Sequence, residues 1–364
     1  MRINVTRTSL PPFEEFCEEI RPLWESCRLT NMGPLHERFK TALEECLGCS
    51  VTLFSHGHLA LEATLELLAL KGKKEVITTP FTFVSTVHAI VRKGLTPVFC
   101  DVLPSDGTMD PVCLERLVSE DTAAILPVHV YGNPCDVEAI DSVGVRESIP
   151  VIYDAAHAFG VKYKGRPLTD WGDASILSFH ASKCFSTVEG GAVCHAPSPS
   201  LEQALDDCKN FGIRDEESCV YPGGNAKFNE LAAAMGLCNL RHFEEAKQAR
   251  KAAFDEYMEG LGECGKEFLL PRDGTERNYG YLPMLLESKE ERDGLYGALR
   301  LKGIGARKYF FPLVSESACY HDSNLPGAGA TPVAENLSER VLCLPIFPGV
   351  PVGEIVAAVK EELP

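Results

Sequence analysis

The chain has few basic residues, no basic cluster and no long apolar segment, and these absences exclude several classes of protein. Its 35 lysine and arginine residues are outnumbered by 52 aspartate and glutamate residues, which gives a formal net charge of −17. No run of Lys and Arg is long enough to follow a phosphate backbone, so we expect no nucleic-acid partner. No stretch approaches the roughly 18 apolar residues of a membrane span, so we expect no membrane partner either.

A secretory signal and a second cysteine pair are also missing. The first residues, MRINVTRTSLPPFEEF, contain no apolar run before a cleavage site, and we expect a cytoplasmic protein. The 15 cysteines are an odd number spread through apolar segments, a pattern typical of reduced, buried thiols. Cys46 and Cys49 form a single CxxC, which favours a structural role over a metal or redox site.

What the sequence does contain is an alternation of strand and helix patterns between residues 51 and 196. The β-branched runs are VTLF, EVITT, TPVFCDV, AAILPVHV, IPVIYD, ASILSF and GAVCH. Near-continuous apolar runs of this kind are typical of strands buried on both faces and connected by crossover helices. They predict an α/β domain around a mostly parallel or mixed sheet, with helices at 58–72 and 109–120 covering it.

The second half of the chain changes character. From about residue 226 it is helical through FNELAAAMGLCNLRHFEEAKQARKAAFDEYMEGL, which is long enough for two helices or a bent one. The last third mixes strands such as YLPMLL and VLCLPIF with helices near 287–302 and 351–363, which predicts a smaller α+β unit. We therefore expect a large α/β domain over residues 1–250, N-terminal segment included, and a small C-terminal domain over 251–364.

GLGECG at 260–265 matches the GxGxxG pattern of dinucleotide-binding turns. It follows the helical run KAAFDEYMEGL, whereas the dinucleotide-binding geometry requires a preceding strand. We therefore interpret it as a helix stop, which counts against a nicotinamide-dependent oxidoreductase.

Lys183 stands in a segment of small, apolar and hydroxyl side chains, SFHASKCFSTVEGGAV. It follows a predicted strand, close to the sheet edge where α/β proteins bind ligands. Burial there would lower its pKa and leave an amine that can form a Schiff base with a carbonyl. The alternative is a loop lysine that extends to water.

Asp154 favours a Schiff-base role for Lys183. It ends another predicted strand, in VIYDAAHAFG. A pyridoxal 5'-phosphate (PLP) site needs a carboxylate against the pyridinium nitrogen as well as a Schiff-base lysine. An isolated aspartate at a strand end is also a common turn former or helix cap, so the prediction depends on the pair.

Candidate residues are also present for binding the phosphate of PLP and for covering the face of its ring. Gly57, in SHGHLAL, lies at a predicted strand-to-helix turn, where free backbone N–H groups and the helix dipole favour a phosphate. Ser178 could add a hydroxyl. Phe83, in TPFTFVST, could cover the face of the ring, although a buried phenylalanine without other context belongs to the core by default.

Together these residues resemble the DegT/StrS-type nucleotide-sugar aminotransferases, PLP enzymes of the aspartate aminotransferase fold (fold type I). The resemblance covers nearly the whole chain and is carried by SLPPFEEF, TNMGPLHERF, PFTFVSTVHAI, DAAHAFG, SFHASK, EGGAV, KFNELAAAMGL and LPIFPG. It implies that Lys183 forms the Schiff base and Asp154 pairs with the pyridine nitrogen. Some relatives that deoxygenate sugars have His in place of the lysine, and Lys183 argues against that branch.

The resemblance also assigns the remaining cofactor contacts. It places His157 beside the 3′ oxygen and Phe83 on the ring, and it implies that Gly57, His58 and Ser178 hold the phosphate. Asn229 would reach the phosphate of a neighbouring subunit, which implies a homodimer with shared active sites. Where many relatives have Asn-Gly-Thr, this chain has Ser55-His56-Gly57-His58, so an imidazole replaces a threonine hydroxyl near the phosphate.

The activity implied by the resemblance is transfer of an amino group from L-glutamate to a keto-sugar nucleotide, with pyridoxamine 5'-phosphate as the intermediate form of the cofactor. The segments PFTFVST, YDAAHAFGVKYKG, NFGIRDEE and PGGNAKFNE are most similar to enzymes that aminate C4 of a dTDP-4-keto-6-deoxyhexose. Products of this type enter polysaccharides or glycosylated natural products.

The sequence leaves several alternatives open. They are 3-amination, a UDP-linked substrate, and a catalytically silent PLP-fold protein that acts as a regulator or binding module. We expect substrate contacts at TNMG, residues 30–33, and at RKYFFP, residues 307–312, although the latter could equally be a core strand.

Overall fold

The computed structural model describes residues 2–262, 265–320 and 325–363. In the large domain, a four-stranded sheet in the order β1-β9-β8-β5 continues into a three-stranded sheet in the order β4-β2-β3. Single parallel bridges, Ile125 to Val151 and Val128 to Asp154, join the two. The strands are β1 (Ser50–Phe54), β2 (Glu75–Thr78), β3 (Thr96–Phe99), β4 (Thr122–Ile125), β5 (Ile152–Asp154), β8 (Ala174–Ser178) and β9 (Gly191–His195).

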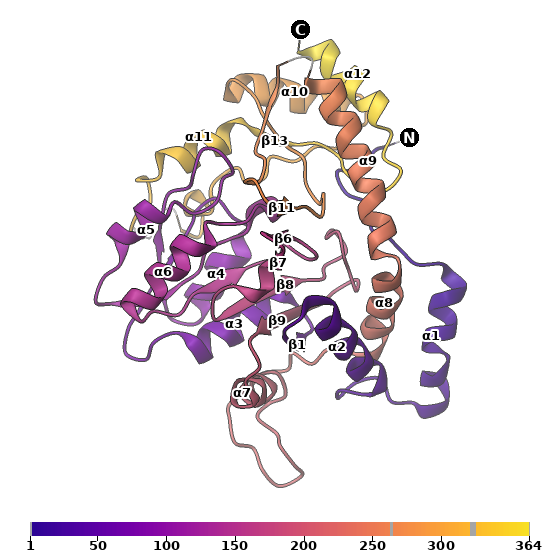
Figure 1. The fold of residues 1–364 in the computed structure, drawn as a ribbon, viewed down its shortest axis with the longest axis vertical. Coiled ribbons are helices and arrows are strands. Elements are labelled where there is room, and N and C mark those ends of the chain that lie inside the picture. The colour runs from indigo at the N-terminus through magenta and orange to yellow at the C-terminus, as the bar shows by residue number, and fades with distance from the viewer. Residues whose placement is uncertain (1, 263–264, 321–324, 364) are drawn as a thin grey trace.

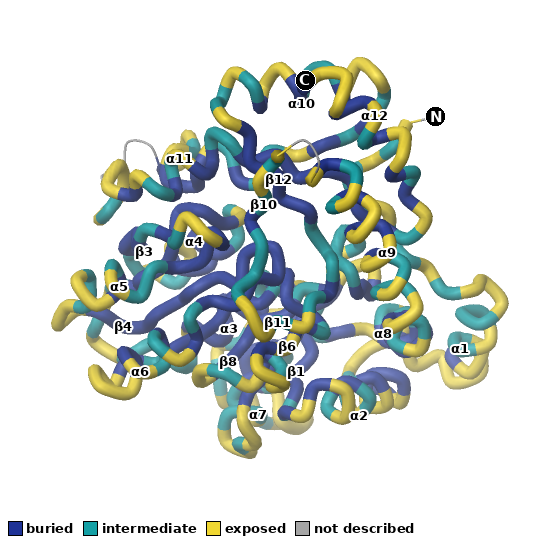
Figure 2. Tube along the Cα trace, turned by 45° about the horizontal axis from the view of Figure 1, so that its top comes forward, coloured by how far each residue is buried: buried dark blue, intermediate teal, exposed yellow. Residues whose placement is uncertain are grey.

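The expectation of a mostly parallel sheet is confirmed, because only β9 runs antiparallel to its neighbours among these strands. Both faces are covered, and successive residues of a strand point into different clusters. Val76 and Ala124 pack with one cluster, whereas Ile77 and Ile125 pack with the other. Two covered faces explain the near-continuous apolar runs, and Figure 2 shows β4 buried along its length between partly exposed helices.

Helices on the two faces come from different parts of the chain. Residues of α3 (Gly57–Leu68), α4 (Val84–Arg92) and α7 (Pro199–Lys209) belong to one cluster. Residues of α2 (Pro34–Leu47), α5 (Pro111–Leu117), α6 (Val137–Glu147) and α8 (Glu230–Arg241) belong to the other. The short elements beside them are β6 (Lys162–Tyr163), β7 (Arg166–Pro167), β11 (Thr275–Glu276) and the 3-10 turns Val130–Gly132 and Leu168–Asp170.

The small domain has a three-stranded antiparallel sheet in the order β10-β12-β13. Its elements are β10 (Glu267–Phe268), β12 (Pro283–Leu285), α10 (Lys289–Leu301), the 3-10 turn Val314–Glu316, α11 (Pro332–Arg340), β13 (Val341–Cys343) and α12 (Val352–Glu362). The expected helical region from 226 forms two helices, α8 and α9 (Phe243–Gly262). No helix within the described ranges combines the length and apolar character needed to cross a membrane.

Helix α9 runs from the large domain to the small one (Figure 1), so the expected division at residue 250 falls inside a continuous helix. The N-terminal segment also joins the two parts. Ile3 forms a parallel bridge with Ile304 of the small domain, while the Thr8 hydroxyl donates to the carbonyl of Ala181 at 2.8 Å. The GLGECG segment begins at the end of α9, which supports the helix stop, and its residues 263–264 lie outside the described residues.

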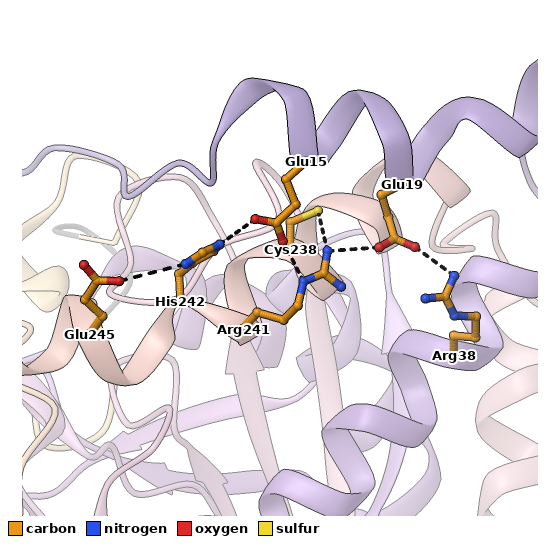
Figure 3. Close-up of polar contacts among 7 residues, drawn as sticks. All are labelled: Glu15, Glu19, Arg38, Cys238, Arg241, His242 and Glu245. Carbon is orange, nitrogen blue, oxygen red and sulfur yellow. Dashed lines mark hydrogen bonds and ion pairs between the residues drawn. The ribbon is translucent and has the colours of Figure 1, made fainter.

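The N-terminal helix α1 (Phe13–Ser26) is held to the junction of α8 and α9 by charged side chains (Figure 3). Arg241 donates to Glu15 at 2.6 Å and to Glu19 at 3.0 Å. The His242 ring contacts Glu15 at 2.6 Å, and Arg38 of α2 donates to Glu19 at 2.8 Å. Leu23 is buried in the core and Phe16 and Ile20 pack against it, so apolar contacts and this network together hold α1 in place.

Glu230, the first residue of α8, is fully buried and holds α2 in place. One carboxylate oxygen accepts from the Leu35 N–H at 2.8 Å and the other from the His36 N–H at 3.1 Å. These N–H groups belong to the first turn of α2, where no intrahelical partner exists and the helix dipole favours a negative charge. Glu230 is therefore a cap supplied from a distant part of the chain.

Replacing Glu230 by Ala should lower the free energy of unfolding by about 2 kcal/mol or more, because two buried N–H groups lose a charged acceptor. Glu230→Gln keeps one acceptor oxygen and should cost less. Urea unfolding followed by circular dichroism would measure both, with the exposed Glu259→Ala in α9 as the matched control. Equal stability of the two alanine variants would contradict the capping role.

Candidate active site

A cavity of about 490 Å³ lies beside the ends of strands β5 and β8 and is closed by residues of the small domain. The large domain contributes most of the expected cofactor residues to its wall. The small domain contributes the side chains Tyr281, Arg307, Tyr309 and Phe310. Of the sequence-predicted site residues, the cavity brings together Gly57, His58, Phe83, Asp154, His157, Ser178 and Lys183.

Lys183 lies in the hairpin loop that connects the end of β8 at Ser178 to the start of β9 at Gly191. The hairpin is closed by Ala181 N–H to the Val188 carbonyl at 2.8 Å, and Lys183 N–H donates to the His180 carbonyl at 2.8 Å. On either side, Phe179 and Phe185 are buried and meet edge to face, with ring centroids 5.3 Å apart. The two buried rings, together with these backbone hydrogen bonds, hold the turn in place.

The Lys183 amine lies 3.4 Å from the Tyr281 hydroxyl. Burial lowers the pKa of Lys183 to about 8, while the Asp154 carboxylate opposes that decrease. An amine with this pKa is partly unprotonated near neutral pH, so it can act as a nucleophile or as a base.

Asp154 is buried, with 5% of its surface exposed. One oxygen accepts from the Thr86 hydroxyl at 2.7 Å, and the other from the Ala156 N–H at 3.1 Å. The Thr86 hydroxyl in turn lies 2.9 Å from that of Thr82. Burial raises the pKa of Asp154, and the hydrogen bonds from Thr86 and Ala156 act against that increase. The geometry leaves a fixed carboxylate that can stabilise a positive charge in the cavity.

His157 is held in one tautomer by the backbone. Its Nδ1 accepts from the Tyr131 N–H at 3.0 Å, and burial lowers the pKa of His157 well below its usual value. A neutral ring with Nδ1 as acceptor carries its proton on Nε2. The residue that presents the N–H, Tyr131, has φ of 58°, an uncommon backbone conformation for a side chain of this size. His157 can therefore donate a hydrogen bond to a ligand oxygen.

The N-terminus of α3 forms a cradle for an anion. Its N-cap residue His56 makes no side-chain hydrogen bond to the helix, so the N–H groups of the first turn stay available. A Cβ at Gly191 would lie 2.4 Å from the Gly57 nitrogen, and one at Gly57 would lie 3.1 Å from Cβ of Ser178. Glycine at both positions lets the helix end approach β8 and β9, and the cradle suits a phosphate.

The His58 ring has other partners. Its Nδ1 lies 2.9 Å from the Ser85 hydroxyl, and its Nε2 lies 3.0 Å from Glu62. Both ring nitrogens are thus engaged within the protein. The backbone N–H of His58, in the first turn of α3, is a second group at this position that could contact a phosphate.

Phe83 and Asn229 lie in very different places. Phe83 is 57% exposed and lines the cavity, so it is not a core residue. Asn229 caps α8, accepting from the Ala232 N–H at 2.9 Å, and does not line the cavity of its own chain. Its expected contact requires a second copy of the chain.

The two expected substrate segments also differ. RKYFFP contributes Arg307, Tyr309 and Phe310 to the cavity wall. Its backbone also forms a bridge between Arg307 and Cys343, so the segment borders the small sheet while facing the cavity. TNMG at 30–33 contributes no residue to the cavity of this chain.

The CxxC cysteines lie apart from the cavity. Cys46 is exposed, whereas Cys49 is buried with its sulfur 4.0 Å from the Thr169 hydroxyl. Within the ranges that the structure describes, no group of three or more His, Cys, Asp and Glu side chains is placed to hold a metal ion.

Three cavity residues or supports were not predicted from the sequence: Thr86, Tyr131 and Tyr281. Thr86 sits one helical turn after Thr82 in PFTFVST, and that spacing could have indicated a pair on one face. Tyr281 begins YLPMLL, a segment whose sequence pattern predicts only a strand. Nothing in the sequence near Tyr131 indicates the positive φ that turns its N–H toward His157.

The Lys183 amine should react with acetic anhydride in a pH-dependent way with a midpoint near 8, because only the unprotonated amine is nucleophilic. Asp154→Asn should move the midpoint to lower pH, since it removes the negative charge that favours the ammonium form. Trace labelling followed by peptide mass spectrometry would measure both, with exposed Lys71 as internal reference. A midpoint unaffected by Asp154→Asn would contradict the coupling.

Comparison with known proteins gives consistent matches over nearly the whole chain. Residues 13–362 match the DegT/DnrJ/EryC1/StrS aminotransferase family. The chain is 40% identical over 349 residues to the dTDP-4-amino-4,6-dideoxy-D-glucose transaminase of Shigella dysenteriae, covering 94% of each chain. It is 38% identical over 352 residues to the Escherichia coli enzyme of the same name, covering 95% of this chain and 94% of that one.

The fold agrees with these sequence matches. The structure of DesI in the presence of its TDP-sugar product matches with a TM-score of 0.91 and 29% identity, covering 99% of this chain and 91% of DesI. The expected fold type and enzyme class are both confirmed, and the nicotinamide alternative is set aside. The chain belongs to the DegT/DnrJ/EryC1/StrS family of PLP-dependent sugar aminotransferases.

Proposed function

We propose that the protein transfers the amino group of L-glutamate to C4 of dTDP-4-keto-6-deoxy-D-glucose. The observation that carries the proposal is the placement of Lys183 and Asp154 in one cavity between the domains. The identity of the sugar rests on the curated relatives of Shigella dysenteriae and Escherichia coli, which are named as dTDP-4-amino-4,6-dideoxy-D-glucose transaminases. The same relatives favour dTDP over UDP and C4 over C3.

The cavity residues fit PLP at each of its polar groups. The N–H groups of Gly57 and His58 and the Ser178 hydroxyl would hold the phosphate. Asp154 would face the ring nitrogen and keep it protonated, supported by Thr86 at 2.7 Å. When bound, PLP supplies the electron sink that makes removal of a proton from an amino-acid Cα feasible.

The ring and its 3′ oxygen have partners of their own. Phe83 is exposed to the cavity and would stack on the ring face. His157, with its proton on Nε2, would donate to the 3′ oxygen while Tyr131 N–H fixes the tautomer. The His157 ring is held by this hydrogen bond before the cofactor binds.

Lys183 has two roles in this proposal: it binds the cofactor covalently and then moves a proton. With a pKa of about 8 the amine can accept the Cα proton near neutral pH and return it as the ammonium group. The Tyr281 hydroxyl, 3.4 Å away, limits where the freed amine can go. In the second half-reaction the Lys183 amine would move protons in the reverse order while the amino group carried by the cofactor replaces the keto oxygen of the sugar, which leaves as water.

A homodimer with shared active sites completes the proposal. The segment between α7 and α8 projects from the body as a long loop below α7 (Figure 1). It exposes apolar side chains, with Phe211 43%, Ile213 48% and Val220 51% exposed. A second copy would cover these groups, and Asn229 just beyond the loop would contact the phosphate in that copy's cavity.

Borohydride reduction of the PLP-loaded protein should attach the cofactor to Lys183, and Lys183→Ala should abolish that linkage and lower turnover at least about 100-fold. The bound cofactor should change its absorbance when L-glutamate is added to wild type. The reaction should then yield an amino sugar from dTDP-4-keto-6-deoxy-D-glucose. Peptide mass spectrometry, absorbance and product chromatography measure these, with Lys71→Ala as the matched control.

The outcomes separate the parts of the proposal. Cofactor attached at another lysine would overturn the assignment of Lys183. A response to a different amino acid would replace glutamate as donor, and faster turnover of a UDP-linked or 3-keto sugar would replace the acceptor. PLP bound without any response to amino acids would favour a silent binding protein.

Mixing inactive Lys183→Ala and Asn229→Ala chains should restore up to about a quarter of wild-type activity. Half of randomly mixed dimers are hybrids, and one site of each hybrid combines an intact Lys183 with an intact Asn229 from the other chain. Activity after denaturing and refolding the mixture measures this. No recovery, with hybrids shown by mass spectrometry, would place Asn229 outside the partner's site.

A further inference from the structure

The segment RKYFFP, residues 307–312, forms part of the cavity wall and also has a side that is turned toward helix α10. Three of its side chains line the cavity. Lys308 and Phe311 are not among the described residues that do so, and both contact side chains of α10. The segment therefore lies between the cavity and α10, and a residue of α10 can influence the cavity without facing it.

Arg292 of α10 makes the main contact on this outer side. Its side chain is fully buried, and its guanidinium carbon lies 4.4 Å from the centre of the Phe311 ring. Nε donates to Asp293, and Nη1 donates to the Ser338 carbonyl at 2.9 Å. Nη2 has no hydrogen-bond partner among the described residues. The negative face of the Phe311 ring thus stabilises a buried charge that is only partly hydrogen-bonded.

Two lysines add positive charge around the same ring. The Lys289 amine lies 5.0 Å and the Lys308 amine 5.9 Å from its centre. Lys308 pairs with Asp293, and Lys289 pairs with Glu339 at 2.8 Å. The Arg292 side chain is 0% exposed, whereas those of Lys289 and Lys308 are 41% and 22% exposed. The arginine contact is therefore the one that water weakens least.

On its cavity side the segment is docked onto the large domain. The Tyr131 hydroxyl donates to the Tyr309 carbonyl. The Phe310 ring is nearly parallel to those of Tyr131 and His157, at centroid distances of 6.2 and 6.1 Å. Tyr131 is also the residue whose N–H holds the His157 ring. The residues next to Phe311 therefore form the part of the wall that meets the cofactor site.

The backbone of the segment is held firmly at its start. Paired hydrogen bonds between Arg307 and Cys343, at 3.0 and 2.8 Å, fix that end beside β13. Four residues later, Phe311 is held by its contact with Arg292. Without this contact the residues between could shift, and the cavity would have its binding shape for only part of the time. A protein with a partly populated binding state binds every ligand of that state more weakly, by the same factor.

We propose that Arg292 is a positioning residue that holds Phe311 from outside the cavity and thereby keeps the wall at 307–312 in the position that binds substrate. The inference rests on the proposed function, in which an amino donor and a keto-sugar nucleotide enter one cavity in turn. Arg292 is not among the described residues that line the cavity. It acts on the fraction of protein molecules whose wall is in place, so its effect is the same for both substrates.

Arg292→Met should weaken the binding of both substrates by one common factor of about 3- to 10-fold, because the cation–π contact that holds the wall is lost. The limiting rate constants at saturation should stay within about twofold of wild type, since bound substrate selects molecules with the wall in place. Arg292→Lys keeps a cation beside the ring and should lie between. Stopped-flow absorbance over a range of concentrations gives both constants, for L-glutamate with the PLP form and for dTDP-4-keto-6-deoxy-D-glucose with the pyridoxamine phosphate form.

Phe311→Leu tests the same contact from its other partner. It should produce a similar factor, and the double variant should bind no more weakly than either single variant, because the two side chains act through one contact. The matched control is Arg300→Met, the same substitution at an exposed arginine of α10 that is not among the described cavity-lining residues. Thermal unfolding followed by circular dichroism gives the folded fraction of each variant. A variant that is only destabilised loses active protein and hence rate, with unchanged dissociation constants.

A further measurement needs neither cofactor nor substrate. In PLP-free protein at a pH well above the Lys183 midpoint of about 8, the amine is unprotonated, so its rate of reaction with acetic anhydride reports access to the cavity. Arg292→Met and Phe311→Leu should raise this rate at least about threefold relative to exposed Lys71, because a displaced wall exposes the amine. Arg300→Met should leave the rate unchanged.

Dissociation constants and Lys183 labelling rates equal to those of Arg300→Met would overturn the proposal. A loss confined to one substrate would also overturn it and would indicate a direct contact. A lower limiting rate with unchanged dissociation constants would assign Arg292 a purely structural role. Wild-type protein that reacts with neither substrate would overturn the proposed function, and the labelling rates alone would then decide whether Arg292 holds the wall.

Discussion

The candidate site depends on keeping an amine and a carboxylate out of bulk water in the same cavity. Burial disfavours the charged form of each group, so the pKa of Lys183 falls and that of Asp154 rises. Their mutual attraction acts in the opposite direction, and so do the hydrogen bonds that Asp154 accepts from Thr86 and the Ala156 N–H. The balance leaves a carboxylate fixed by two donors and an amine that can change protonation near neutral pH. Neither group could reach this state alone on an exposed loop.

That balance requires rigid supports. Buried Phe179 and Phe185 on either side of the Lys183 hairpin hold the turn at the edge of the sheet. The antiparallel strand β9 places Gly191 against the first turn of α3, where any side chain would collide with the backbone of Gly57. The antiparallel pair β8 and β9 therefore supports both the phosphate cradle at the start of α3 and the turn that carries Lys183. The small domain closes it with Tyr281, which contacts the lysine directly.

Much of this arrangement could be predicted from the chain. The apolar runs indicated the strands because both sheet faces are covered, and the helical repeat from residue 226 indicated two helices. Motif likeness identified Lys183, Asp154 and His157, and the structure brings all three to the cavity. The motif was less informative at His58, where the imidazole pairs with Ser85 and Glu62, because side-chain pairing depends on neighbours that are distant in sequence.

The sequence by itself determined the order of strands and helices, the chemical groups available and the family to which they belong, because these follow from local periodicity and from motifs. Only the tertiary structure decided that Tyr131 fixes the tautomer of His157 and that Glu230 caps a helix nearly two hundred positions earlier. It also decided that Arg307, in the last third of the chain, lines the same cavity as Lys183. These properties depend on distances between residues far apart in the chain, and no local pattern encodes such distances.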